Sequence, residues 1–512
     1  MIKMNKERLI IEDYENEFFF KKKNKSLNVS FNRIAFIFFA FLFVCLIYSI
    51  KVIYLGSLES EFNIEKKNFL KKNYRADIID RNGDFLVKTV NTINIGINPK
   101  LIIDKQKLLI NLQIIFPDKD FKKIDKKISK KKFFYLEKKV SQEKYERLRM
   151  LGDKSIIPEE KIARVYVQEN LFSHILGQID DSNNGISGIE KFFDQDLKTR
   201  KEPLKLTVDT NIQFLIREQL LRFQEIFKSQ GSAAILMDVN NGEIISMVSL
   251  PDFDLNKREN IKDLKYINRA TKAVYELGSV FKTFTITAAL HENLIQVDTN
   301  FLNLDKQITC GKNIIREYDD EIPSNLTVEQ ILIQSGNIGS VRIGQKLGIE
   351  RFKSFLSNIG VLSRIDFDIE EIGIPIKFKW GKCKLATASF GHGITTTPLQ
   401  LAKGYAIISN GGFEINPTLL RKNSKKQKKR IIREGVSEKI NLILRKIVTT
   451  KEGTASLANI EGFEIGGKTG TAQKSIAGKY SKKKINTFVS VFPTSKPKFV
   501  LAIMLDEPKT NN

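Results

Sequence analysis

The chain has 512 residues, and its 84 Lys and Arg against 59 Asp and Glu give a net charge of +25. The positive residues are spread among Ile, Asn and Phe without a nucleic-acid-binding motif, so we expect no nucleic acid as partner. Three isolated histidines and three cysteines give no metal-ligand spacing, and we expect neither a metal nor a cofactor. The length allows two folded domains and a tail.

The N-terminal region predicts a membrane anchor. Residues 34–50 carry no charge, and with residues 52–55 the segment is just long enough to span a bilayer. A cleaved signal peptide is the alternative, but the apolar run is too long and no small-residue cleavage site follows it. Basic residues precede the span, which predicts a cytoplasmic tail over 1–33, an anchor over 34–55 in the cytoplasmic (inner) membrane, and an outer location for the rest.

A second module is expected over residues 56–205. It begins with a strand and an Asn82-Gly83 turn, and it contains no constellation of catalytic side chains. We expect it to hold the rest of the chain away from the membrane and to contact partners.

The third region, residues 206–512, begins with a predicted hairpin over 233–248 that turns at Asn241-Gly242. Two further strands are predicted near the C-terminus, over 486–493 and 499–506, where they would continue the same sheet.

A serine nucleophile is predicted at Ser279. Gly278 allows a sharp turn before it, and the residues after it read as a buried helix. Lys282 lies one helical turn later, so its amine can face the Ser279 hydroxyl. Burial and a nearby cation such as Lys468 would lower the pKa of Lys282 and let it accept the serine proton. The Ser-x-x-Lys spacing is expected about once by chance in such a chain, so it is weak alone.

Ser335 and Asn337 form a second candidate pair, in a small-residue turn after a predicted helix. Ser335 could relay a proton between two lysines, and Asn337 could bind a substrate amide. A capped helix end is the alternative, because Ser and Asn favour such turns.

Lys468 lies between glycines, which suits a strand whose edge a substrate backbone approaches closely. Lys468 and Thr469, followed by Gly470, would attract and orient a carboxylate. The amides of Thr471 and Ser279 could form an oxyanion hole. A phosphate-binding loop is excluded because the required glycine spacing is absent.

The few histidines and cysteines limit which catalytic bases and which disulfides the chain can have. A Ser-His-Asp triad would need one of the isolated histidines, so Lys282 is the most economical base. For His392 we expect a local packing role beside the cleft. Cys310 and Cys383 could pair in an oxidising compartment, and the sequence leaves this open.

The three motifs, in this order, resemble those of the class B penicillin-binding proteins. The resemblance covers the chain from about Arg75 to the C-terminus. Residues 386–393 and 397–402, and Glu276-Leu-Gly before the serine, are similar to the division-specific (septal) branch. Arg164-Val-Tyr and residues 185–190 are similar to the pedestal of the family.

The resemblance implies an α+β fold of the serine β-lactamase type, an antiparallel sheet flanked by helices, preceded by a transmembrane helix and a mostly β pedestal, or dimerisation, domain. The activity it implies is a peptidoglycan D,D-transpeptidase that cross-links stem peptides through a Ser279 acyl-enzyme and is trapped by β-lactams. The implied catalytic residues are Ser279, Lys282, Ser335, Asn337 and Lys468, with Thr469, Gly470 and Thr471 binding substrate.

The resemblance also implies partners. No glycosyltransferase module precedes the catalytic region, so a separate membrane-embedded glycan polymerase is expected, together with other division proteins. The alternatives are an elongation-specific transpeptidase, a β-lactamase, and a non-catalytic β-lactam sensor or division scaffold. The acceptor amine and the oligomeric state stay open.

Two departures from the family pattern are expected to matter. Val167 stands where the family usually has proline, which puts that local turn in doubt. The family's closing helix does not follow the last predicted strand, so we expect a truncated sequence with one sheet face uncovered.

Overall fold

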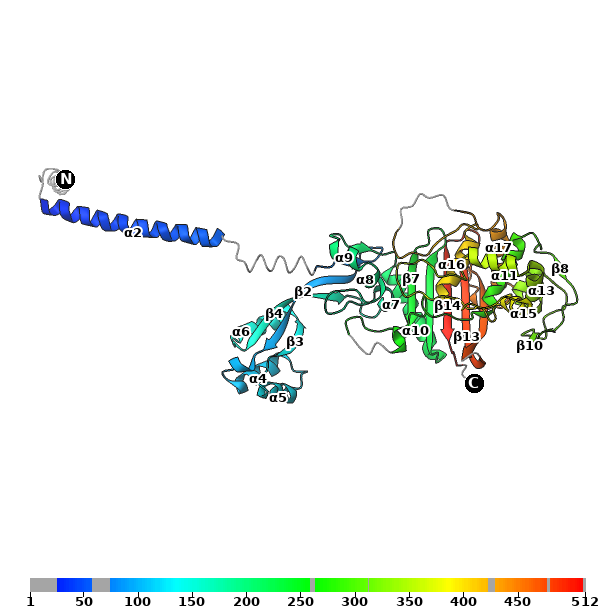
Figure 1. The fold of residues 1–512 in the computed structure, drawn as a ribbon, viewed down its shortest axis with the longest axis horizontal. Helices are drawn as coiled ribbons and strands as arrows, with labels where there is room; N and C mark the ends of the chain where they lie inside the picture. The colour runs from blue at the N-terminus through cyan, green and yellow to red at the C-terminus, as the bar shows by residue number, and fades with distance from the viewer. Residues whose placement is uncertain are drawn as a thin grey trace, which may run out of the picture. The chain divides into compact units, whose positions relative to one another are not determined.

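The computed structural model describes residues 25–57, 74–257, 263–311, 313–421, 429–476 and 479–509 (Figure 1). It consists of two units, Met1–Lys72 and Asn73–Asn512, which we treat separately. Most of the predicted cytoplasmic tail lies outside the described residues.

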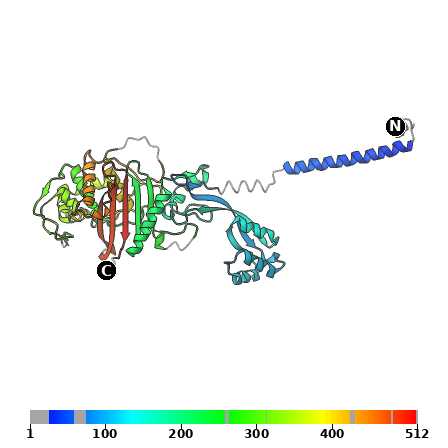
Figure 2. The same ribbon diagram turned by 180° about the vertical axis from the view of Figure 1, so that it is seen from behind.

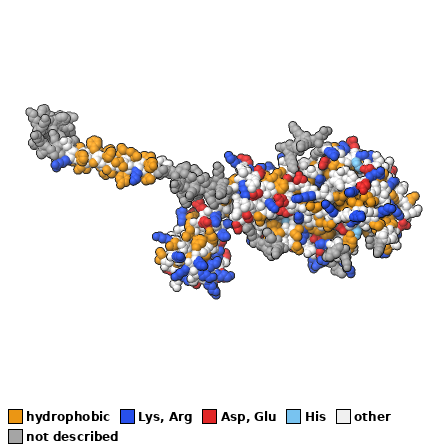
Figure 3. All heavy atoms as spheres, in the orientation of Figure 1, with side chains coloured by type: hydrophobic (Ala, Val, Ile, Leu, Met, Phe, Trp, Pro, Cys, Tyr) orange, Lys and Arg blue, Asp and Glu red, His pale blue; other side chains and the backbone are white. Residues whose placement is uncertain are grey.

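The first unit contains one long apolar helix, α2 (Lys25–Ser57). Its segment Asn32–Ser57 has a mean hydropathy of 2.6 and is long and apolar enough to cross a membrane. Hydrophobic side chains run along the length of this helix (Figure 3). The helix fits a single-pass membrane anchor, and it contains the predicted span.

The second unit begins with the pedestal module, which we define as residues 74–205. Its sheet has the strand order β3-β2-β1-β5, and β4 also pairs with β2. β2 and β4 pair from Val87↔Tyr166 to Ile97↔Ile156. The module consists of β1 (Ile78–Ile79), β2 (Phe85–Ile97), η1 (Pro99–Leu101), α4 (Lys105–Ile115), α5 (Phe121–Ser129), β3 (Phe134–Val140), α6 (Gln142–Met150), β4 (Ile156–Tyr166), α7 (Ser173–Leu176), α8 (Gly188–Phe192), α9 (Asp194–Thr199) and β5 (Leu204–Lys205).

Two cores hold this module. Ile95 and Ile97 of β2 pack with Leu108 and Leu112 of α4 in a small core of their own. The opposite end of β2, from Leu86, belongs to the large core of the rest of the unit. Val167 donates its backbone N–H to Leu86 O at 3.0 Å, a bond that proline could not make, so the strand pairing continues through this position.

A buried ion cluster joins three distant segments of the pedestal. Arg75 and Arg164 both bond Glu190, and Arg75 Nη1 also meets Asp194 Oδ1 at 2.7 Å. The side chains of Arg75 and Glu190 are 0% exposed. Because buried guanidinium groups must be paired, these contacts fix the start of the module against its last helices.

The third region is an antiparallel sheet with the order β12-β13-β14-β6-β7, so the C-terminal strands lie beside the first hairpin (Figure 2). β6 and β7 turn at Gly242, whose φ is +81°. The strands of this sheet are β6 (Gly231–Asp238), β7 (Ile244–Leu250), β12 (Gly466–Ile476), β13 (Lys479–Phe492) and β14 (Phe499–Asp506). Two small two-stranded sheets are formed by β8 (Asn300–Phe301) with β11 (Leu326–Thr327) and by β9 (Gln307–Cys310) with β10 (Asn313–Arg316). The predicted hairpin and both predicted C-terminal strands are confirmed.

Helices cover one face of this sheet, and the other face is covered mainly at β6 and β7. The expected uncovered face is therefore found in part, because alternate side chains of β14 stay only half-buried there. α10 packs on β6 and β7 through Leu220, Ala234 and Val248, while α11, α16 and α17 lie over the opposite face. The helices are α10 (Thr210–Ile226), η2 (Leu264–Tyr266), η3 (Gly278–Val280), α11 (Phe281–His291), α12 (Val328–Ile333), α13 (Asn337–Leu347), α14 (Ile349–Asn358), α15 (Lys382–Ala388), α16 (Pro398–Ser409), α17 (Val436–Thr449) and η4 (Ser456–Ala458). The layers confirm the expected α+β arrangement.

Candidate active site

Ser279 lies in the tight turn η3, directly before the buried helix α11. Gly278 has a φ of +68°, and a Cβ there would come within 2.5 Å of Thr471 O. Only glycine fits this position, which presses the serine turn against β12. Tyr405 donates its hydroxyl to Val280 O at 2.8 Å and holds the turn from below.

Lys282 is the second residue of α11 and is 0% exposed. Its Nζ donates to the backbone oxygen of Ser335 and to Ser335 Oγ, the latter at 3.1 Å. The bonds of this amine therefore run to Ser335, and the direct contact with the Ser279 hydroxyl stays a prediction.

Ser335 occupies the turn between α12 and α13 with a φ of +58°. A capping box of Thr327 and Gln330 starts α12, as the predicted helix requires. The Ser335 hydroxyl lies between the two lysines, with Lys282 Nζ at 3.1 Å and Lys468 Nζ at 2.9 Å. Asn337 begins α13 and donates its Nδ2 to Arg316 O at 2.8 Å.

Lys468 lies on β12, which is the terminal strand of the sheet, as predicted. The side chain is 0% exposed, and besides Ser335 its amine reaches Thr454 Oγ1 at 3.4 Å and Thr469 O at 3.2 Å. Thr454 also bonds Thr469 Oγ1 at 2.9 Å. Thr454 was not predicted, and the only signal for it is a Gly-Thr pair in the loop before β12.

The electrostatics of the two lysines follow from their burial. Burial lowers the pKa of Lys282 well below its usual value, the charge of Lys468 lowers it further, and Glu317 opposes both. Burial also lowers the pKa of Lys468, to about 7. Neutral amines are therefore accessible near neutral pH, which is the condition for an amine to act as a base.

A cavity of ≈ 460 Å³ opens over these groups. It brings together residues of all three motifs with residues that were not predicted, among them Tyr318, Phe390, Thr454 and Lys484. The predicted residues that line it are Ser279, Ser335, Asn337, Thr469, Gly470 and Thr471, with His392 on its wall.

His392 packs as expected and also faces the cleft. Its ring stacks on Tyr480 with centroids 4.3 Å apart, and its Nδ1 lies 3.7 Å from Glu276 Oε2. Burial lowers the pKa of His392, with Glu276 opposing this change.

The open question about the cysteines is answered by the fold. Cys310 and Cys383 form a disulfide with a Cα–Cα distance of 5.4 Å. It fastens the turn of the β9–β10 hairpin to α15.

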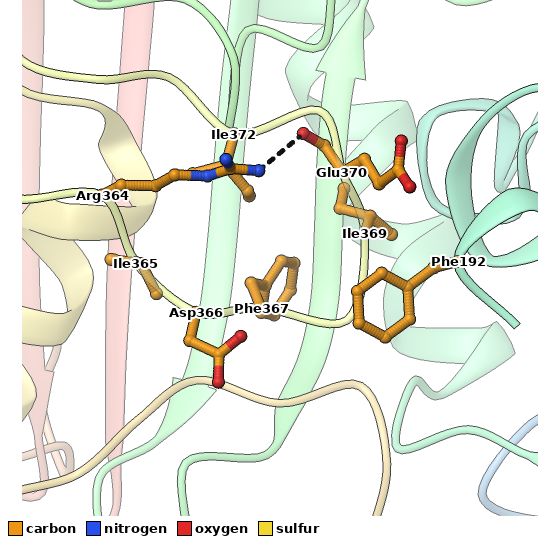
Figure 4. A pocket seen from close by; sticks show the side chains of 8 residues that line it. All are labelled: Phe192, Arg364, Ile365, Asp366, Phe367, Ile369, Glu370 and Ile372. Atoms are coloured by element: carbon orange, nitrogen blue, oxygen red, sulfur yellow. Dashed lines mark hydrogen bonds between the residues drawn. The ribbon is translucent and has the colours of Figure 1, made fainter.

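A second pocket, of ≈ 330 Å³, lies at the segment Arg364–Ile372 beside Phe192 of α8 (Figure 4). Its lining contains no hydroxyl, thiol or lysine amine, so it offers no acyl-transfer chemistry. In the described residues no three His, Cys, Asp or Glu side chains form a metal-binding group.

Comparisons with known proteins agree with this geometry. The penicillin binding protein transpeptidase domain matches residues 232–512, and the penicillin-binding protein dimerisation domain matches residues 71–220. The chain therefore belongs to the penicillin-binding protein transpeptidase family.

Relatives refine the assignment. The peptidoglycan D,D-transpeptidase FtsI of Buchnera aphidicola is 30% identical over 517 residues, covering 92% of this chain and 88% of its own. The probable peptidoglycan D,D-transpeptidase FtsI of Caulobacter vibrioides is 27% identical over 453 residues, covering 85% of this chain and 76% of its own. The protein is a class B penicillin-binding protein of the septal D,D-transpeptidase type.

A solved structure shares the fold. Penicillin-binding protein 3 of Mycobacterium tuberculosis, determined as a complex with aztreonam, matches with a TM-score of 0.67 at 21% identity, over 85% of this chain and 90% of that one.

Proposed function

We propose that Ser279 is the nucleophile of a D,D-transpeptidase reaction and that Lys282 is its base. One observation carries the proposal: the Ser335 hydroxyl bridges two buried lysines in the cavity that Ser279 lines. This set supplies a nucleophile, a base and a proton relay without histidine.

Acylation begins when Ser279 Oγ attacks the carbonyl carbon of the penultimate D-alanine of a stem peptide. Neutral Lys282 takes the hydroxyl proton as the new C–O bond forms. The amides of Ser279 and Thr471 stabilise the tetrahedral oxyanion. The peptide C–N bond then breaks, and the departing D-alanine amine receives a proton through Ser335.

The acyl-enzyme is resolved by a second amine. The amine of a neighbouring stem peptide attacks the ester carbon, loses its proton to the lysine pair through Ser335, and releases Ser279 with its proton restored. Lys468 and Thr469 hold the substrate carboxylate during the first step. Asn337 binds the peptide amide of the stem. A β-lactam presents the same carbonyl but no departing group, so it leaves Ser279 acylated.

The labelling experiment tests the nucleophile directly. Full-length chain in detergent is incubated with a fluorescent penicillin, and the covalent label is read after denaturation. Ser279→Ala should lose the label, whereas Ser354→Ala, an exposed serine of α14, should keep it. Label retained in Ser279→Ala would overturn the assignment. A label that disappears within minutes would indicate a β-lactamase.

We also propose that α2 anchors the protein in the cytoplasmic membrane with its N-terminus inside and the catalytic region in the periplasm. The apolar helix supports the anchor, and the basic residues before it support the orientation. Alkaline phosphatase fused after residue 509 should be active, and fused before residue 25 it should be inactive. The reverse pattern would contradict the orientation.

The partner we propose is a membrane-embedded glycan polymerase, together with other division proteins. The pedestal module, which carries no acyl-transfer site among its described residues, is the part available for such contacts. Cross-linking from exposed pedestal lysines in dividing cells should capture a polytopic membrane protein at the septum. If the protein and its cross-linked partner lay along the side wall of the cell instead, the result would indicate an elongation-specific transpeptidase.

A further inference from the structure

Glu317 follows β10 and is joined to the second motif by two hydrogen bonds. Its Oε2 accepts the backbone N–H of Asn337 at 2.6 Å, and its Oε1 accepts that of Ile338 at 2.8 Å. Arg316, the residue before it, accepts the Asn337 side chain through its backbone oxygen. The end of β10 thus holds the first residues of α13 by three bonds.

The turn held in this way is the one that places the Ser335 hydroxyl. Ser335 has a positive φ, a conformation that a non-glycine residue keeps only when its surroundings impose it. Tyr318 donates its hydroxyl to Gln334 O at 2.9 Å on one side of the turn. Glu317 holds the other side through Asn337. The backbone around Ser335 is therefore fixed from both ends by adjacent residues of one hairpin.

The hairpin itself is fastened at its far end. Cys310 and Asn313 are paired across the hairpin turn, and the disulfide ties Cys310 to α15. Glu317 therefore follows a hairpin that the disulfide fastens to α15, which limits how far the turn of Ser335 can move.

Glu317 also acts on the lysines by charge. The charged groups of the described residues that act on Lys282 are Lys468, from β12, and Glu317, after β10. The carboxylate favours the protonated form of Lys282, so it raises the pKa that burial and Lys468 lower.

We propose that Glu317 is a positioning residue for acyl transfer: through its bonds to the backbone of Asn337 and Ile338 it holds the turn of Ser335 against the two lysines. This inference rests on the proposed function of Ser279 and Lys282. The simpler alternative is an acidic cap of α13, which would stabilise the helix without altering the chemistry.

Three substitutions of Glu317 separate the effect of its side-chain length from the effect of its charge. Glu317→Gln keeps the length but removes the charge and one acceptor; Glu317→Asp keeps the charge but shortens the reach; Glu317→Ala removes both. Asp320→Asn, at an exposed acid of the same loop, is the matched control. The readout is the second-order rate constant of labelling by fluorescent penicillin, measured across pH in full-length protein, alongside the melting temperature.

The expected results differ for each variant. Glu317→Gln should lower the maximal rate about tenfold, because one buried amide loses its acceptor. It should also move the midpoint of the rising limb of the pH profile to lower pH, since Lys282 then loses its proton more readily. Glu317→Asp should lower the rate without moving the midpoint. Glu317→Ala should lower the rate up to about a hundredfold. Asp320→Asn should match the unmodified chain.

Two outcomes would overturn the inference. One is a rate and a midpoint in Glu317→Gln that equal those of the unmodified chain. The other is a rate that falls only in step with the melting temperature while the midpoint stays fixed, which would reduce Glu317 to a cap of α13. A failure of the proposed function looks different, because the unmodified chain would then not label at Ser279.

Discussion

The catalytic cleft and the pedestal module both bury basic side chains, but these side chains have carboxylate partners in the pedestal and none in the cleft among the described residues. In the pedestal, Arg75 and Arg164 share Glu190, and Arg75 also bonds Asp194. In the cleft, Lys282 and Lys468 bond hydroxyl and carbonyl oxygens, and no ion pair with either is found in the described part of the chain.

The difference follows from the two side chains. A guanidinium keeps its proton at any accessible pH, so its burial requires a carboxylate partner. A lysine amine gives up its proton when it is desolvated, so it is buried without a partner and becomes a base. Buried arginines with carboxylate partners stabilise the pedestal, whereas buried lysines without such partners make the cleft reactive.

The largest expected effect comes from removing the reactive amine. Lys282→Met should lower the labelling rate by about 10²–10⁴, because the base is lost. The melting temperature should hold or rise, since a buried polar group has been replaced by an apolar side chain of similar length. Lys346→Met, on the exposed side of α13, is the control for both measurements. A labelling rate within tenfold of the unmodified chain would show that Lys282 is not the base.

Removing the shared carboxylate tests the other half of the comparison. Glu190→Gln leaves two buried arginines without their common partner, and it should destabilise the protein by roughly 3–5 kcal/mol. The labelling rate of the protein that remains folded should be unchanged. Thermal unfolding followed by circular dichroism checks this, with the exposed Glu202→Gln as control. Equal melting of the two variants would show that the cluster does not hold the pedestal.

Removing the disulfide tests how much the stability of the protein depends on the covalent link between the β9–β10 hairpin and α15. Cys383→Ser should destabilise the protein by roughly 2–4 kcal/mol, because the closed loop is long. Reduction of the unmodified chain should reproduce this loss. Cys45→Ser, in α2, should not. A melting temperature insensitive to reductant would contradict the pairing.

The smallest effect is a pH dependence of the labelling rate, no more than about tenfold per pH unit. The pKa of Lys282 is lowered, so the rate should rise with pH as Lys282 becomes neutral. It should fall again as Lys468, with a pKa near 7, loses the charge that attracts the substrate carboxylate. Lys468→Arg keeps that charge and should remove the falling limb. A falling limb that persists in Lys468→Arg would assign it to another group.

The motifs could be predicted from sequence where their geometry is local. The turn at Gly278 and the helix after it are encoded by neighbouring residues, as is the glycine-flanked strand around Lys468. What could not be predicted is which distant groups meet. Thr454 reaches Lys468, and Glu317 reaches Asn337, only because the sheet and hairpin fold back on one another.

The pedestal gives the same lesson. Arg75, Arg164 and Glu190 were each part of a recognisable stretch, yet nothing local indicated that they share one ion cluster. The pairing of Cys310 with Cys383 was open for the same reason, because the β9–β10 hairpin and α15 are neighbours only in the folded chain.

β12 ends its sheet, and a terminal strand presents unpaired backbone groups that template association with other chains. The serine turn packs closely on this strand, because a Cβ on Gly470 would lie 2.4 Å from Leu277 O. Because the cavity is lined by Thr469, Gly470 and Thr471 of this strand, an extended peptide that paired with its edge there would lie beside the turn of Ser279.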